Sequence, residues 1–239
     1  MKMNTRIFPD LPALNLAVLQ DIDRLIADAV SHRGRFAIAL SGGHTPASLY
    51  SLWSQRDQSS TPWDRIHLFW GDERFVPPDD PLSNYRMTRE ALISRVPIPE
   101  ANVHRFHTEL PTPEAAAADY ESTLRAFFGS APPQFDLQLM GLGGEGHTAS
   151  LFPGSPGLQE KTRWVMAVEA PVKPPQRLTF TPVVLNQGRN TYFLVAGEEK
   201  RDIIQKLRAE PEGKPSAYPA RQLQPVGAVI WFLDREAAG

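Results

Sequence analysis

Residues 134–157 read QFDLQLMGLGGEGHTASLFPGSPG, an apolar segment that runs directly into a glycine-rich one. The apolar residues predict a buried strand, and Gly141, Gly143 and Gly146 match the spacing G-x-G-x-x-G. In a dinucleotide-binding fold, the third glycine enters a long helix that packs on the sheet. Here the sequence PGSPG at residues 153–157 interrupts any such helix, so binding of a nicotinamide dinucleotide is disfavoured.

His147 follows the last of these glycines directly, with Thr148 and Ser150 close behind it. An imidazole titrates near neutral pH and can take a proton from water, so His147 is our candidate general base. A nucleophilic serine is disfavoured because the chain lacks G-x-S-x-G, and a zinc hydrolase because it lacks both cysteine and H-E-x-x-H. The alternative is a purely structural histidine, which is our interpretation of His32, His67, His104 and His107.

Apolar strands alternate with helical patterns on both sides of this stretch. The predicted strands are RFAIAL, IHLFWG, FDLQLMGL, WVMAVEA, RLTF, TYFLVAG and AVIWFLD, and the predicted helices cover residues 12–31, 46–55, 83–95, 113–128 and 198–207. This alternation predicts an α/β fold with a mostly parallel sheet covered on both faces. Because no repeat or linker divides the chain, we expect residues 1–239 to form a single domain.

The composition narrows the classes of partner. The formal net charge is −2, from 25 basic and 27 acidic residues, so we expect no nucleic-acid or membrane surface. Cysteine is absent, which excludes disulfides, thiolate zinc sites and a cysteine nucleophile. The longest apolar runs are too short to span a bilayer, and the first residues lack a signal-peptide pattern, so we expect a cytoplasmic location. Protein partners are left undefined by the sequence.

A second strand exit suits an anion. The sequence SGGHTP places Ser41, Gly42 and Gly43 between a strand and a helix that can begin near Pro46. Glycines let the backbone approach a ligand closely, and the free N–H groups of a helix start favour a negative charge. We therefore expect a phosphate here, although the chain has no nucleotide-binding P-loop motif. The alternative is an ordinary turn that is capped by Thr45.

A third strand exit, in WGDERFVP, brings Asp72, Glu73 and Arg74 together. The guanidinium of Arg74 offers a planar fork of donors that suits a phosphate or carboxylate. The alternative is a solvated cluster of charges, which the position directly after an apolar strand makes less plausible. Asn84, at a predicted helix start, is a candidate polar lining residue.

Two further cations complete the set of candidates. Arg177 opens the predicted strand RLTF, and Lys200 lies in the first turn of the predicted helix after Gly197. A lysine in a first turn interacts unfavourably with the helix dipole, at a cost of about 0.3 to 1 kcal/mol. A bound anion would offset this cost, so Lys200 is a candidate to bind one.

Six of these sequence motifs together resemble those of a known enzyme family. SGGHTP, WGDERFVP, SNYRM, GLGGEGHTASLFPGS, PPQRLTFT and VAGEEK, in this order over almost the whole chain, resemble the 6-phosphogluconolactonases of the oxidative pentose phosphate pathway. The resemblance is specific because six separated motifs agree in order. It implies a three-layer αβα fold, shared with the glucosamine-6-phosphate deaminases and similar to ribose-5-phosphate isomerase, and hydrolysis of 6-phospho-D-glucono-1,5-lactone without a metal or cofactor.

The resemblance also implies roles for single residues. His147 falls on the family's proposed base, Arg74 and Lys200 on its phosphate-binding cations, and Ser41, Gly42 and Gly43 on its phosphate loop. The expected reaction is attack of a His147-activated water on the lactone carbonyl. Its oxyanion donors stay open between amides near Gly143 and Gly144 and the guanidinium of Arg177.

This chain departs from the family pattern at two positions. Glu145 stands where most relatives have aspartate, and His44 where they often have serine, so the supporting role of Glu145 and the direction of His44 stay open. Two other functions also stay open: a glucosamine-6-phosphate deaminase or isomerase, and a regulator that binds sugar phosphate without catalysis. The deaminases resemble this loop but carry Asn-Glu-Pro at the positions of Leu151, Phe152 and Pro153, which favours the lactonase.

Overall fold

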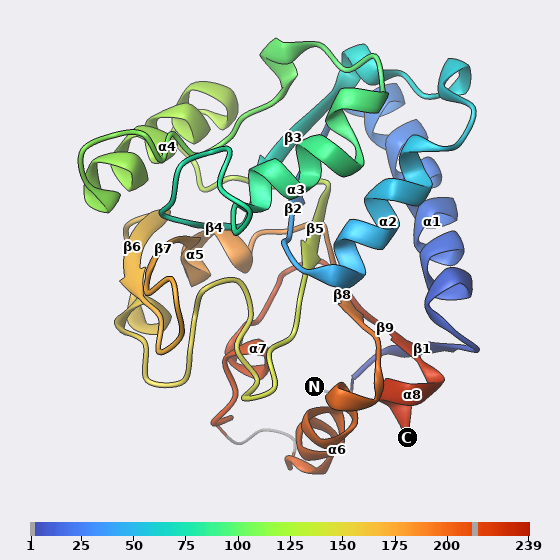
Figure 1. The fold of residues 1–239 in the computed structure, drawn as a ribbon, viewed down its shortest axis with the longest axis vertical. Helices are drawn as coiled ribbons and strands as arrows, with labels where there is room; N and C mark the ends of the chain where they lie inside the picture. Colours follow the sequence, from blue (N-terminus) through green and yellow to red (C-terminus); the bar gives the residue numbers. More distant parts are fainter. Residues whose placement is uncertain (1–2, 212–214) are drawn as a thin grey trace.

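The computed structural model of the chain describes residues 3–211 and 215–239. Within these residues, six parallel strands form a central sheet in the order β1-β9-β8-β5-β2-β3 (Figure 1). Their bounds are β1 Thr5–Phe8, β2 Phe36–Leu40, β3 Ile66–Trp70, β5 Leu137–Met140, β8 Asn190–Val195 and β9 Ala228–Asp234. The predicted α/β class and the mostly parallel sheet are therefore confirmed.

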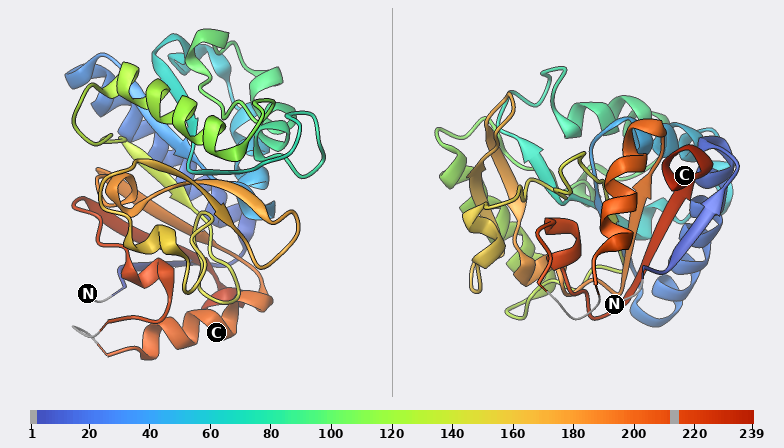
Figure 2. Two further views of the ribbon diagram at one scale, coloured as in Figure 1. Left: turned by 90° about the vertical axis from the view of Figure 1, so that its left-hand side faces the viewer. Right: turned by 90° about the horizontal axis from the view of Figure 1, so that it is seen from below.

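Helices flank this sheet. Their bounds are α1 Leu11–Arg33, α2 His44–Ser54, α3 Asn84–Ala91, α4 Pro113–Phe128, α5 Pro182–Leu185, α6 Arg201–Ala209, α7 Pro219–Gln222 and α8 Arg235–Ala238. Figure 1 shows α1 and α2 on one side of the sheet and α4 on the other, and Figure 2 shows the same layers from two further directions. The strands β2 and β5 are buried along their whole length, as expected for parallel strands that are covered on both faces.

A second, antiparallel sheet lies beside the first. It consists of β4 (Asp72–Arg74), β7 (Gln176–Phe180) and β6 (Val165–Glu169), in that order. Gly71 joins the two sheets, because its N–H donates to the carbonyl of Leu40 at 2.9 Å and its carbonyl accepts from the N–H of Phe180 at 2.8 Å. The chain therefore leaves β3 and enters β4 at once, which places Asp72–Arg74 at the junction of the sheets.

The element boundaries follow local signals in most places. Asp10 caps α1 by accepting from the N–H of Ala13, and Gly34 ends it in a left-handed conformation, close to the predicted helix at residues 12–31. The helix α4 begins and ends as predicted. The predicted helix at residues 83–95 is shorter than expected, since α3 ends at Ala91 and a 3₁₀ turn, Ile93–Arg95, follows. The short strands β1 and β4 were not predicted.

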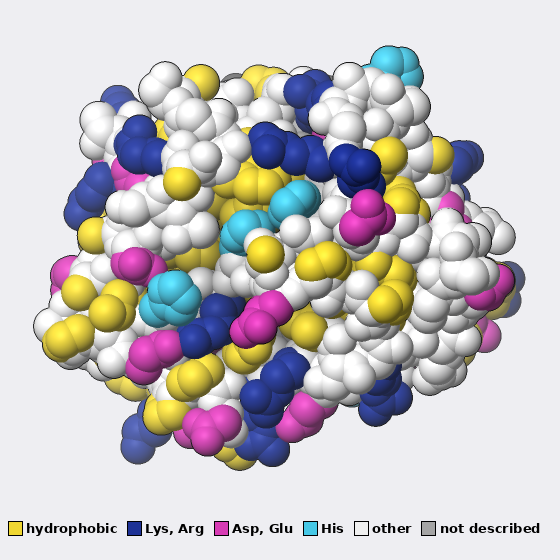
Figure 3. Space-filling view, turned by 90° about the horizontal axis from the view of Figure 1, so that it is seen from above, with side chains coloured by type: hydrophobic (Ala, Val, Ile, Leu, Met, Phe, Trp, Pro, Cys, Tyr) yellow, Lys and Arg dark blue, Asp and Glu magenta, His cyan; other side chains and the backbone are white. Residues whose placement is uncertain are grey.

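The surface carries mixed charges. Figure 3 shows cationic and anionic side chains interspersed on one face, together with two adjacent histidine side chains in a hollow.

Two histidine rings, those of His67 and His104, are in contact, with 5.5 Å between their centroids. Among the described residues, no helix combines the length and the apolar character that crossing a lipid bilayer requires.

Candidate active site

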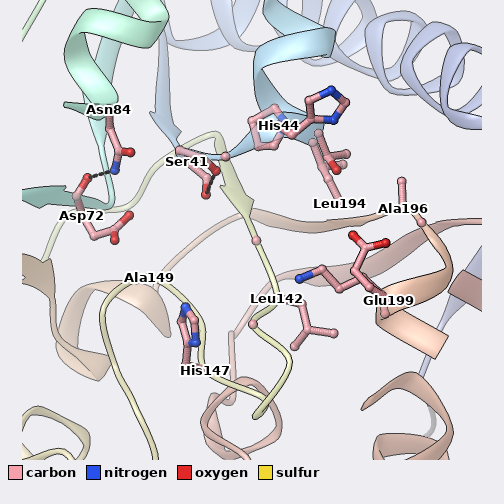
Figure 4. Close-up of a pocket in the computed structure, with 18 of the residues that line it drawn as sticks. Ser41, His44, Asp72, Asn84, Leu142, His147, Ala149, Leu194, Ala196 and Glu199 are labelled. Carbon is pink, nitrogen blue, oxygen red and sulfur yellow. Dashed lines mark hydrogen bonds between the residues drawn. The ribbon is translucent and has the colours of Figure 1, made fainter. Parts of the chain in front are cut away.

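A pocket of about 640 Å³ lies at the carboxyl ends of β2, β5 and β8, beside β4. Ligands gather at this edge in open α/β sheets, because loops and helix starts converge there. Figure 4 shows Asp72 and Asn84 on one side of the pocket, His44 and Glu199 on the other, and His147 between them. The predicted site residues that line it are Ser41, Gly42, Gly43, Asp72, Arg74, Asn84, His147, Arg177 and Lys200. Glu145 is outside the set of described lining residues.

The loop after β2 forms an open helix start. Gly43 is the N-cap of α2, and among the described residues no side chain caps it, so the predicted alternative of a Thr45 cap is wrong. Gly42 has no room for a side chain, since a Cβ there would lie 1.9 Å from Asn84 Oδ1. His44 is exposed and lines the pocket at the first residue of α2. The free amides of this helix start are therefore presented to the pocket.

Glu73 is a structural residue rather than a lining residue. Its carboxylate is 2 % exposed and accepts the backbone N–H groups of Arg74, Asn84 and Tyr85 at 2.7–2.8 Å. Burial raises the pKa of Glu73 to about 7, although these three donors act in the opposite direction. Glu73 thus fixes the start of α3 against β4.

Asp72 connects three segments of the site. Its Oδ2 accepts from Ser150 Oγ at 2.7 Å. Its carbonyl accepts from Asn84 Nδ2 at 3.0 Å, as Figure 4 shows. The side chains of Asp72, Asn84 and Ser150 are 8 %, 2 % and 1 % exposed. Asp72 therefore ties β4 to α3 and to the segment that carries His147.

Arg74 and Arg177 lie directly opposite each other across β4 and β7. Like charges in this position repel. Each guanidinium also donates to a backbone carbonyl, Arg74 to that of Leu82 and Arg177 Nε to that of Pro174 at 2.7 Å. Arg177 is 6 % exposed, and both burial and the charge of Arg74 lower its pKa. Arg74 Nε is buried without a hydrogen-bond partner in the described part of the chain. The two arginines place two positive charges at the wall of the pocket.

His147 is held at the pocket by close packing. Its ring stacks on Phe152 with 4.2 Å between centroids, and its side chain is 27 % exposed. A Cβ on Gly143 would lie 2.0 Å from His147 Nδ1, so the imidazole occupies the space that a side chain would need. The lack of a side chain at Gly143 therefore leaves room for the imidazole.

Glu145 lies next to the imidazole of His147. Its Oε2 is 3.1 Å from His147 Nδ1, within ion-pair distance, although the ring nitrogen makes no aligned hydrogen bond to any described residue. Partial burial acts to raise the pKa of Glu145. A hydrogen bond from its own backbone to the carboxylate and the charges of His147 and Lys200 outweigh this effect, so the pKa is lowered. An anionic carboxylate therefore stands beside the candidate base.

Lys200 enters the pocket from the 3₁₀ turn Glu198–Lys200, which leads into α6. The sequence prediction missed its neighbours: Glu199, Asp234 and Glu236 also line the pocket. The segment GEEK contains Glu199, but nothing in its local pattern distinguishes it from a solvated helix start. Among the described residues, no group of three or more histidine or acidic side chains is placed to hold a metal ion.

Comparison with known proteins fits this geometry. A family model described as glucosamine-6-phosphate isomerases/6-phosphogluconolactonase matches residues 9–231. The chain belongs to this family. Similar family members include a 6-phosphogluconolactonase of Synechocystis, 46 % identical over 89 % of this chain and 87 % of the relative. A 6-phosphogluconolactonase of Nostoc is 42 % identical over 99 % of this chain and 98 % of its own.

Solved structures of the family share the fold. The 6-phosphogluconolactonase from Trypanosoma cruzi has a TM-score of 0.86 at 30 % identity and covers 99 % of this chain and 96 % of its own. A monomeric glucosamine-6-phosphate deaminase has a TM-score of 0.80 at 22 % identity, with 99 % of both chains covered, which shows a shared fold alone. The predicted three-layer architecture and the predicted family are confirmed.

Proposed function

We propose that the pocket hydrolyses 6-phospho-D-glucono-1,5-lactone to 6-phospho-D-gluconate, a step of the oxidative pentose phosphate pathway. The observation that carries the proposal is that one pocket brings three cations, Arg74, Arg177 and Lys200, together with an imidazole packed against Gly143. Relatives at 42–46 % identity carry the same activity in their names.

The anionic end of the substrate is assigned to the cationic side of the pocket. Arg74 would bind the phosphate with Lys200, assisted by the hydroxyl of Ser41 and the amides of Gly42 and Gly43. Charge-assisted hydrogen bonds of this kind are about twice as strong as neutral ones. The phosphate thus fixes the lactone so that its carbonyl carbon C1 faces His147.

The chemical step uses His147 as base and then as acid. Neutral His147 takes a proton from water, and the resulting hydroxide oxygen bonds to C1 to form a tetrahedral oxyanion. The oxyanion collapses, the bond from C1 to the ring oxygen breaks, and the imidazolium returns its proton to that oxygen. Such acid–base assistance contributes about 10² to 10⁴ in rate.

Arg177 is our choice of oxyanion donor. The N–H of Gly143 donates to the carbonyl of His147 at 2.9 Å, and Gly144 is outside the described lining residues. Arg177 is buried at the pocket wall, where its charge is weakly screened by water. The anionic Glu145 beside Nδ1 would stabilise the imidazolium during the reaction.

The deaminase alternative fits the pocket less well. Phe152 stacks on His147 at the position where the deaminases carry an acidic residue, so an apolar ring occupies the place of their proton-transfer partner. The wild-type chain separates the alternatives. We expect hydrolysis of freshly generated lactone above its spontaneous rate and no ammonia release from glucosamine 6-phosphate. Ammonia release would support the deaminase, and binding of 6-phosphogluconate without turnover would support the regulator.

The remaining expectations belong to the same proposal. The partner is a small sugar-phosphate lactone, and neither nucleic acid nor membrane has a role in the reaction. We propose the cytoplasm as the location, in keeping with a chain that contains no cysteine. We also propose that residues 1–239 act as one domain, since buried side chains from both sheets, such as Leu137 and Leu178, belong to one apolar cluster.

A further inference from the structure

The loop that carries His147 is closed by its own backbone. The N–H of Gly146 donates to the carbonyl of Gly143, and the N–H of Gly143 donates to the carbonyl of His147, both at 2.9 Å. Thr148 Oγ1 donates to the carbonyl of Gly141 at 2.8 Å and ties the loop to the end of β5. In so tight a turn, a movement of Gly146 moves the imidazole of the next residue.

A segment from the C-terminal part of the chain covers this loop. We call residues 216–222 the strap. A Cβ on Gly146 would lie 2.6 Å from Tyr218 Cδ1 and 2.8 Å from Tyr218 Cβ, so the tyrosine side chain lies directly on the Gly146 backbone. The N–H of Ala220 donates to the carbonyl of Gly146 at 3.0 Å. Gly146 has a φ of 82°, which only glycine adopts readily, so the loop accepts this contact without a side chain of its own.

The strap is itself fixed to the end of α6. Glu210, the residue after α6, accepts from Ser216 Oγ at 2.6 Å and from the N–H of Ala217 at 3.3 Å. Ser216 Oγ in turn accepts from the N–H of Tyr218 at 2.9 Å. Lys200, which lines the pocket, is the N-cap residue of the same helix. One helix therefore connects the candidate phosphate cation to the segment that supports the candidate base.

We infer that Tyr218 is a positioning residue for His147, an assignment that rests on the proposed function. Tyr218 is outside the described residues that line the pocket, so it acts on the reaction through Gly146 and not on the substrate. Placement errors of about 1 Å at a reacting group can cost about 100-fold in rate. Loss of the tyrosine ring lets the loop move away from C1 while the phosphate contacts stay in place.

The test compares three variants of the full chain. Tyr218→Ala should lower kcat for the freshly generated lactone about tenfold or more and leave KM unchanged, since the phosphate site is intact. Tyr218→Phe should retain wild-type kcat, because the contact with Gly146 is made by Cβ and ring carbons. The matched control is Leu223→Ala, which removes a buried side chain just beyond the strap. It should lower the unfolding temperature but not kcat.

Three outcomes overturn the inference: unchanged kcat in folded Tyr218→Ala, an equal loss of kcat in Leu223→Ala, or a rise in KM alone. If Tyr218→Ala does not fold, Tyr218→Leu decides in the same way, with a smaller expected loss. The wild type and His147→Ala are measured in parallel. Absence of hydrolysis by the wild type contradicts the proposed function, whereas a normal wild type with an unaffected Tyr218→Ala contradicts only the role of Tyr218.

Discussion

Gly143 shows at the scale of one residue how a glycine-rich strand exit can present a histidine. The sequence predicted His147, Arg74 and Lys200 as site residues because unusual residue types follow predicted strands, and the structure brings all three to one pocket. The sequence could not show that a Cβ at Gly143 would collide with the imidazole, or that Glu73 accepts the first N–H groups of α3. Both facts depend on contacts between segments that local patterns do not encode.

Replacement of Gly143 by alanine tests whether the absence of a side chain at this position gives the imidazole of His147 its space. The new Cβ would collide with His147 Nδ1, so the imidazole must move, and we expect kcat to fall by about tenfold or more. Gly144→Ala is the matched control, since a Cβ at Gly144 meets no described atom within 4 Å. Steady-state kinetics with the lactone check both variants. Equal activity in the two would show that the glycine at position 143 does not serve the histidine.

At the scale of elements, the site depends on β4, a strand of three residues. The strand β4 was not predicted from the sequence, because three residues are too few to show an alternating pattern. The strand nevertheless sets Arg74 opposite Arg177 and brings Asp72 to Ser150. The charge cluster at this strand exit was predicted from its position, whereas its pairing with β7 required the folded chain.

Glu73→Gln tests how β4 is fixed to α3. The amide that replaces one carboxylate oxygen places an N–H₂ donor against backbone N–H donors at the start of α3, so the free energy of unfolding should fall by about 1 to 3 kcal/mol. Denaturant titration measures the change. Glu90→Gln, on the exposed side of α3, should cost much less, because water screens its pairing with Arg86. Similar losses in the two variants would contradict the capping role of Glu73.

The whole molecule combines a parallel sheet, which the sequence predicted, with an antiparallel sheet, which it did not. The segments WVMAVEA and RLTF were predicted as strands, but strand propensity does not tell which sheet a strand joins. The chain passes from one sheet to the other at Gly71, whose backbone makes hydrogen bonds to both sheets.

A pair of histidines lies away from the pocket, near the amino end of β3. His67 Nδ1 and His104 Nε2 are 3.2 Å apart.

This histidine pair predicts a loss of stability in acid. Burial, His67 and Arg35 lower the pKa of His104 to about 4, and burial and Arg35 also lower the pKa of His67. Below the ordinary histidine pKa of about 6.5, the unfolded chain therefore binds more protons than the folded chain. The free energy of unfolding should be fully maintained above this pH and should decrease as the pH falls toward 4.

Denaturant titrations between these two pH values check this prediction, with His104→Phe as the comparison variant. An aromatic ring without a titrating group keeps the packing against Phe69 and Phe127, so this variant should lose less stability in acid than the wild type. An identical pH dependence in both proteins would show that the pair does not control the acid response.

In the proposed reaction, His147 acts as the base of a lactone hydrolase. The most direct test measures hydrolysis of freshly generated 6-phospho-D-glucono-1,5-lactone by His147→Ala, with the spontaneous rate subtracted. We expect turnover to fall by about 10² to 10⁴ while binding of 6-phosphogluconate is retained, because the phosphate contacts are untouched. His107→Ala, at an exposed histidine paired with Asp119, should behave as the wild type. Wild-type turnover by His147→Ala would show that His147 is not the base.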